Sequence, residues 1–161
     1  FLEEIQFYPQ KVDELNQQEI QYLLGNWLEE LLYDEIQKQL KLSEKFILRN
    51  VVIHRENSLG KSIPNEFDIL FTFDNTLYLV ECKTGLGGRE TMKENFQKAI
   101  YKLTALKNEF GLDVQGIFVT TANIRDSEEG YEYYLNRANV HRIKIYDGED
   151  LKNGINWSLK V

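Results

Sequence analysis

The stretch NEFDILFTFDNTLYLVECK, from Asn65 to Lys83, decides the fold expected for this chain. Apolar and polar residues alternate on both sides of Asp74 and Asn75, which are residue types favoured in tight turns. If these two residues form a two-residue hairpin loop, Phe73 pairs with Thr76 and fixes the register of both strands. The sequence therefore predicts an antiparallel hairpin.

The hairpin register brings ionisable side chains together, with Asp68 opposite Glu81 and Glu66 opposite Lys83. Opposite residues of an antiparallel pair share one face, with Cα atoms roughly 4.5–5.5 Å apart. Facing carboxylates repel, so strand packing does not explain them, whereas a cation between them does. Carboxylates suit Mg²⁺ or Mn²⁺, which can deliver a water or hydroxide to a phosphodiester. Asp68 and Glu81 are therefore predicted metal ligands, and Lys83 would orient the water or stabilise the developing charge.

An exposed lattice of ion pairs on a solvated sheet face is the competing interpretation of these charges. The apolar opposite face and the glycine-rich turn after Lys83 favour an active site instead. The residues expected on that apolar face are Phe67, Ile69, Phe71, Tyr78, Val80 and Cys82.

The order of the remaining elements predicts an α/β fold. Apolar spacing indicates one long helix over 13–42, or two helices joined near Gly25, and later helices near 89–111 and 127–139. Strands are expected at 46–54, 66–73, 76–83, 114–121 and 143–146, followed by a polar tail. Three successive strands imply an antiparallel meander, and the later alternation implies parallel crossovers. A mixed sheet flanked by helices follows.

Length and composition limit the alternatives. The chain has 161 residues, enough for a single domain over 1–161, with 1–20 as an N-terminal helical extension. No apolar run approaches a membrane span and no leader opens the chain, so a cytoplasmic protein is expected. With one cysteine and two histidines, a zinc site on those residues is not expected. The net charge of −7 argues against broad electrostatic binding of nucleic acid, although clustered metal-ligand carboxylates contribute to it.

At Asp68 and at Glu81-Cys82-Lys83 the sequence resembles the PD-(D/E)xK restriction-endonuclease-like superfamily. The sequence at residues 65–71 and 81–84 is similar to that of the nuclease domain of CRISPR ancillary nucleases activated by cyclic oligoadenylate. The resemblance implies a restriction-endonuclease-like fold, an Mg²⁺- or Mn²⁺-dependent endonuclease, and a role in prokaryotic antiviral defence. Such nucleases carry an amino-terminal CARF sensor domain. Nothing in this sequence resembles that domain, so ligand-gated activation is not expected of the chain as given. A missing N-terminal sensor domain in a longer parent protein is left open.

Further site residues follow from the same resemblance. A glutamate on the first helix commonly completes such sites, and the match to Gly25-Asn26-Trp27-Leu28-Glu29-Glu30 assigns this role to Glu29, with Glu30 in reserve. The run from Gln97 to Tyr101 is similar to an element of RecB-like nucleases, which makes Gln97 a candidate substrate contact. The other candidate substrate contacts are Thr84, Arg89 and Lys93. Surface positions on helices or loops account for these residues equally well.

Two functions are weighed on this basis. The first is hydrolysis of phosphodiester bonds in DNA, with RNA as a second candidate substrate and a homodimer as a candidate assembly. The second is a catalytically silent module on the same fold that binds nucleic acid or protein. The complete set of Asp68, Glu81 and Lys83 favours the enzyme.

Overall fold

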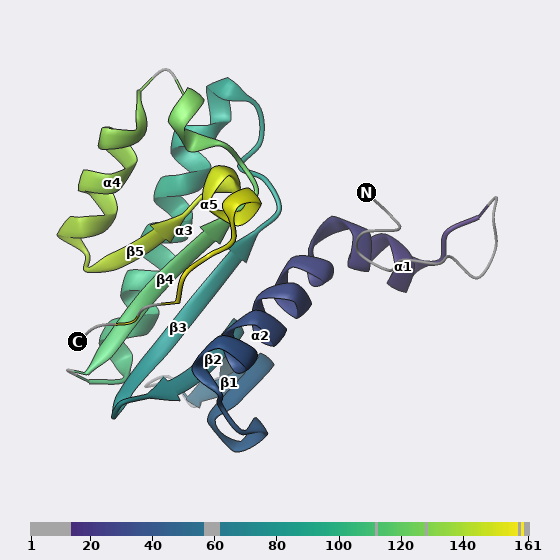
Figure 1. Ribbon diagram of the computed structural model, residues 1–161, viewed down its shortest axis with the longest axis vertical. Coiled ribbons are helices and arrows are strands. Elements are labelled where there is room, and N and C mark those ends of the chain that lie inside the picture. The colour runs from purple at the N-terminus through teal and green to yellow at the C-terminus, as the bar shows by residue number, and fades with distance from the viewer. Residues whose placement is uncertain (1–13, 57–61, 112, 128, 158, 160–161) are drawn as a thin grey trace.

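The computed structural model describes residues 14–56, 62–111, 113–127, 129–157 and 159, and its centre is one five-stranded sheet (Figure 1). The strands lie in chain order, β1 beside β2 and so on to β5. The β1–β2 and β2–β3 pairs are antiparallel, whereas β3–β4 and β4–β5 are parallel. Their bounds are β1 Ile47–Glu56, β2 Ser62–Phe73, β3 Thr76–Lys83, β4 Val114–Thr120 and β5 Ile143–Tyr146. The predicted mixed sheet is confirmed.

Helices precede the sheet and connect its parallel strands. The α-helices are α1 Gln17–Gln21, α2 Trp27–Leu40, α3 Arg89–Glu109, α4 Tyr131–Val140 and α5 Gly148–Asn153. Short 3-10 turns lie at η2 Glu44–Phe46 and η3 Ile124–Asp126. A π-helical turn, η1 Tyr22–Asn26, links α1 to α2 and contains Gly25, where the sequence left open one helix or two. No helix in the described ranges is both long and apolar enough to cross a membrane.

Each face of the sheet is covered by its own helices. On one face, α2 places the fully buried Leu28, Leu32 and Ile36 against the sheet. On the other face, α3 and α4 contribute a second buried cluster that includes Phe96 and Tyr134. Figure 1 shows α2 on the near side of the sheet and α3 behind it. Side chains at the edge of the sheet can therefore be approached by residues from α2 on one face and from α3 or α4 on the other.

The predicted hairpin forms as expected. Asp74 and Asn75 have φ values of 49° and 60°, the left-handed pair that a two-residue type I′ turn requires. From this turn the expected register runs from the Phe73–Thr76 pair to Ile69 opposite Val80.

Beyond Ile69 and Val80, β2 and β3 no longer pair. The end of β3 continues its pairing with β4, and β2 stays with β1, where Glu66 lies opposite Val52. The prediction that Glu66 faces Lys83 is therefore wrong, and the predicted Asp68–Glu81 pair also lies just outside the β2–β3 ladder. The physical reason is that each strand keeps its other neighbour as the two separate, so the hairpin register cannot extend to this position.

One residue expected on the apolar face lies elsewhere. Ile69, Phe71, Tyr78, Val80 and Cys82 belong to the cluster beneath α2, but Phe67 belongs to the cluster beneath α3. Its ring packs edge-on against Phe110 with centroids 5.5 Å apart. The side-chain alternation of β2 is broken at Asp68, opposite which β1 has a positive φ of 54° at Asn50.

The C-terminal segment is more ordered than the expected polar tail. Asp147 caps α5 by accepting hydrogen bonds from the N–H groups of Glu149 and Asp150, and the Asp150 side chain bonds back to the cap. Ile155 and Trp157 then return to the core beneath α2. An acid three residues before another acid is a capping signal that the periodicity of apolar residues does not report.

Candidate active site

The separation of β2 from β3 creates the centre of the site. Asp68, with 9% of its surface exposed, lies at this point on β2. Its Oδ2 accepts a hydrogen bond from the Cys82 N–H on β3, at 2.6 Å. In a continuous β-ladder a backbone carbonyl would accept the hydrogen bond from this N–H group, and here the Asp68 carboxylate accepts it instead. This bond fixes the orientation of the Asp68 carboxylate.

Glu81 lies beside this point on β3 and is held by two lysines. It is only 2% exposed. Lys83 Nζ lies 2.8 Å from its Oε1. Lys102 Nζ, which comes from α3, lies 2.9 Å from Oε1 and 2.8 Å from Oε2. Sequence reasoning missed Lys102, because no local signal relates a position on α3 to the register of β3.

Glu29, on α2, lies close enough to Asp68 for the two charges to interact. Its Oε2 is buried and has no hydrogen-bond partner among the described residues. Burial, followed by the negative charge of Asp68, raises the pKa of Glu29 to about 7. A buried carboxylate oxygen without a partner is costly, so this group needs either a proton or a cation.

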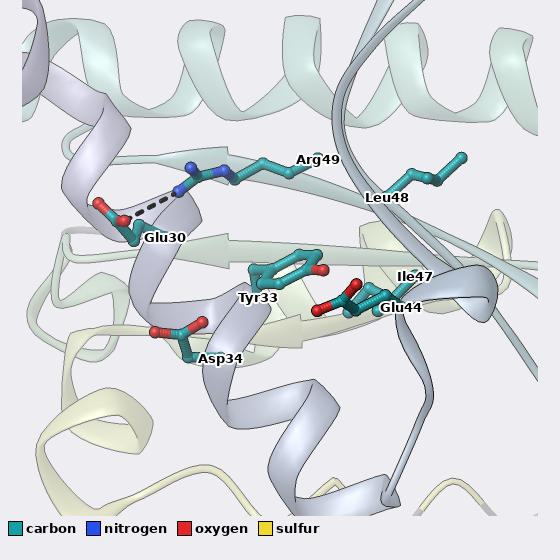
Figure 2. Close-up of a pocket in the computed structure, with 7 residues that line it drawn as sticks. All are labelled: Glu30, Tyr33, Asp34, Glu44, Ile47, Leu48 and Arg49. Carbon is teal, nitrogen blue, oxygen red and sulfur yellow. Dashed lines mark ion pairs between the residues drawn. The ribbon is translucent and has the colours of Figure 1, made fainter.

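Glu30, the reserve for the helix acid, points to a different place. It lines a separate pocket of about 410 Å³ between α2 and the start of β1. Figure 2 shows Arg49 reaching along this pocket toward Glu30, with an N–O distance of 3.7 Å. Tyr33 and Asp34 lie on the same side of α2 (Figure 2). The structure therefore places Glu29, rather than Glu30, near Asp68.

The electrostatics of the site disfavour two ionised carboxylates without a cation. Burial, followed by the charge of Glu81, raises the pKa of Asp68 to about 6. Partial burial alone would lower the pKa of Lys83, but the contact with Glu81 outweighs it and raises the pKa above its usual value. Lys83 is therefore a permanent cation here, whereas Asp68 and Glu29 are poised to exchange protons near neutral pH.

The raised carboxyl pKa values predict that the metal-free protein loses stability as pH increases from about 5 to about 8. A carboxyl group whose pKa is higher in the folded state binds protons more tightly there than in the unfolded chain. The stabilisation is complete below the unfolded pKa of about 4, and it is lost as pH rises through about 6 and about 7. Thermal unfolding in EDTA should show a midpoint roughly 5 °C lower at pH 8 than at pH 5.

Glu29→Gln should flatten this pH dependence, because it removes the titrating group with the higher pKa. Glu30→Gln is the matched control on the neighbouring position and should leave the pH dependence unchanged. Equal pH dependence in the wild type and Glu29→Gln would contradict the assignment of Glu29 to this cluster.

A pocket of about 510 Å³ opens beside Glu81 and Lys83. Three lysines line it, namely Lys83, Lys98 and Lys102, together with Asn95. Lys98 is itself paired with Glu94, at 2.6 Å. This part of a chain with a net charge of −7 is thus locally cationic and suits a phosphate group.

The candidate substrate contacts on α3 lie toward α4 instead. The Gln97 amide donates a hydrogen bond to the Tyr133 hydroxyl. Lys93 Nζ lies 3.5 Å from Glu129 and 4.9 Å from the centre of the Tyr133 ring. Neither residue lines the pocket formed by Lys83, Lys98 and Lys102, which is called the lysine pocket below.

Thr84 and Arg89 complete the set of expected contacts. The Thr84 hydroxyl donates to the Leu24 carbonyl in the π-helical turn before α2, so it joins this turn to the end of β3. Arg89 begins α3, but its side chain lies outside the described part of the structure.

The donor set fits a hard divalent cation, although the metal site is not preformed. Asp68, Glu81 and Glu29 supply carboxylate oxygens, the ligands Mg²⁺ and Mn²⁺ prefer, and one of those oxygens is buried without a partner. Among the described residues, no three His, Cys, Asp or Glu side chains are arranged to hold a metal ion. Both oxygens of Glu81 contact lysines instead.

Comparison with known families decides the identity of this fold. Residues 16–158 match the family model described as Card1-like, endonuclease domain. The chain belongs to this family. The expected resemblance to the restriction-endonuclease-like superfamily, and to CRISPR ancillary nucleases within it, is therefore confirmed. No match was found among curated protein sequences.

Two solved structures share the fold of this Card1-like domain. VC1899 from Vibrio cholerae matches with a TM-score of 0.67 and 20% identity, over 86% of this chain and 34% of that one. Can2 from Sulfobacillus thermosulfidooxidans, solved in complex with cyclic tetra-adenylate, matches with a TM-score of 0.61 and 22% identity. That match covers 86% of this chain and 37% of Can2. The chain thus spans little more than a third of either protein.

Proposed function

We propose that the chain is a metal-dependent endonuclease that hydrolyses phosphodiester bonds of DNA, with RNA as a second substrate to be tested. The observation that carries this proposal is the approach of Glu29 from α2 to Asp68, at the point where β2 and β3 separate. Glu81 and Lys83 lie beside this point on β3. Membership of an endonuclease family supports the same reaction class.

The carboxylates would hold Mg²⁺ or Mn²⁺. When bound, such an ion supplies a Lewis acid that activates water and offsets negative charge on the phosphoryl group. Asp68 is held in a fixed orientation by the Cys82 N–H, so its carboxylate is preorganised as a ligand. Glu29 offers an oxygen that no protein group occupies in the described structure.

Lys83 would act on the substrate itself. Its raised pKa keeps it charged, and 41% of its side chain is exposed beside the lysine pocket. A fixed ammonium at this position can orient the attacking water and stabilise charge on the phosphoryl oxygens. The lysines of the pocket would receive the adjacent phosphate of the strand.

The relatives support a proposal for the biological setting. Can2 was solved with cyclic tetra-adenylate, and the present chain covers only 37% of it. We infer that this chain is the nuclease part of a prokaryotic antiviral defence protein in the cytoplasm, with any cyclic-nucleotide sensor on a separate domain. A homodimer would allow cleavage of both strands of a duplex.

A catalytically silent binding module is the second candidate. The observation that favours it is that both Glu81 oxygens are paired with lysines and no three metal-type side chains are grouped among the described residues. The unpartnered Glu29 oxygen opposes it, because a module without a cation would leave this buried oxygen uncompensated.

Cleavage assays on supercoiled plasmid, single-stranded DNA and RNA, with Mg²⁺ or Mn²⁺ and with EDTA, test the proposal. We expect cutting of DNA that requires metal and is absent in EDTA. The Asp68→Asn variant, purified in parallel, controls for contaminating nucleases. No cutting of any substrate, together with no metal binding in calorimetry, would support the silent module.

A further inference from the structure

Lys102 and Lys83 contact the Glu81 carboxylate at the same shortest distance, 2.8 Å. The Lys102 ammonium lies within 2.9 Å of both carboxylate oxygens, whereas Lys83 contacts Oε1. Because Glu81 is 2% exposed, little solvent is available to replace these contacts. The ammonium of Lys102 therefore provides the positive charge that Glu81 needs when no metal is bound.

Lys102 also has room to leave this position. Its side chain is 45% exposed, compared with 3% for Glu81. The 510 Å³ pocket that it lines begins beside Glu81 and is shared with Lys98 and Asn95. A flexible four-carbon side chain anchored on α3 can move its ammonium into this space without any change in the backbone.

We propose that Lys102 is the resident counter-cation of Glu81, and that a divalent metal must displace it to reach this carboxylate. This inference rests on the proposed function, since it presumes that a metal binds at Asp68 and Glu81. Lys102 is then a positioning residue: it holds Glu81 ready in the metal-free protein and weakens metal binding by competing for the same oxygens.

The neighbouring carboxylates differ from Glu81 in this respect. Glu29 has one buried oxygen without a partner, and Asp68 is held by a backbone N–H. These two gain a counter-charge when metal arrives, whereas Glu81 exchanges one cation for another. Metal binding should therefore become easier when the Lys102 charge is removed.

Calorimetric titration of Mn²⁺ into the purified protein tests this exchange. Lys102→Met should bind Mn²⁺ about fivefold to tenfold more tightly than the wild type, the effect of losing one partly exposed ion pair. Lys102→Arg keeps the charge and should bind no more tightly than the wild type. Lys98→Met removes one positive charge from the same pocket without removing a contact to Glu81. The Mn²⁺ affinity of this variant should stay within about twofold of the wild-type value.

Thermal unfolding provides a second readout that is independent of cleavage. Without metal, Lys102→Met should melt at a lower temperature than the wild type, because Glu81 loses a partner, and saturating Mn²⁺ should restore more stability to it than to the wild type. Lys102→Gln, which keeps a hydrogen-bond donor, serves if the methionine variant does not fold.

The outcomes separate this inference from the proposed function. Equal Mn²⁺ affinities in Lys102→Met and Lys98→Met would overturn the role of Lys102 and leave the nuclease proposal intact. An absence of Mn²⁺ binding to the wild type and to every variant would overturn both.

Discussion

Replacing Asp68 with asparagine is expected to abolish cleavage and, in the same protein, to raise stability. The variant removes a charge that would hold the metal, and several kcal/mol of lost transition-state stabilisation correspond to a rate at least about 10³-fold lower. Asparagine keeps an oxygen that can accept the Cys82 N–H, so the local geometry is retained.

The gain in stability follows from the pKa of Asp68. Burial and the charge of Glu81 raise that pKa to about 6, so ionisation of Asp68 opposes folding at neutral pH. Removing the ionised group should increase the free energy of unfolding by about 2 kcal/mol at pH 7.5 in EDTA, since one pKa unit corresponds to 1.36 kcal/mol. Chemical denaturation with and without metal measures this change.

Asp74→Asn is the matched control for this substitution. Asp74 is exposed in the hairpin turn with a φ of 49°, a conformation that asparagine also accepts. We expect cleavage and stability close to the wild type, within about 0.5 kcal/mol. A variant at Asp68 that kept normal cleavage, or that lost stability as metal-free protein, would contradict the assigned role.

Replacing Lys83 with methionine is the second large effect. We expect cleavage about 10²- to 10³-fold slower, the range for removing one preorganised electrostatic donor. Methionine retains the apolar stem of the side chain, so the loss reflects the ammonium group and not the packing. Single-turnover cleavage of plasmid DNA at saturating metal isolates this step from binding.

Two further measurements show whether the slower cleavage of Lys83→Met reflects the position of its ammonium group. Calorimetry should show that Lys83→Met still binds Mn²⁺, because the carboxylates remain. Lys98→Met lines the same pocket but pairs with Glu94, and its cleavage rate should fall by less than about tenfold. A loss in Lys98→Met as large as in Lys83→Met would indicate that the pocket charge, and not the position of Lys83, supports the reaction.

The hairpin was predictable from the sequence because its turn is local. Asp74 and Asn75 adopt the positive φ values of a two-residue loop, and this loop fixes the register as far as Ile69 and Val80. The mixed sheet was predictable for a related reason, since short links favour antiparallel neighbours and helical connections favour parallel ones.

The site depends on strand pairing and helix packing between distant parts of the chain, which the local sequence does not predict. Glu66 was expected opposite Lys83, but eight residues from the turn the pairing of β2 with β1 takes precedence. Gln97 and Lys93, the predicted substrate contacts on α3, lie beside Tyr133, whereas Lys98 and Lys102 line the pocket. The rotation of α3 is set by packing of its buried side chains against the sheet.

The sequence by itself determined the turn, the strand register near it, the mixed sheet and the family, because these follow from short-range conformation and from local motifs. Only the tertiary structure decided which helix acid approaches Asp68, and that Lys102 holds Glu81. Glu29 and Glu30 are adjacent in sequence and differ by 100° around a helix, so their surroundings depend on how α2 packs. Lys102 is 21 residues from Glu81, and contact between them exists only after α3 has folded back onto β3.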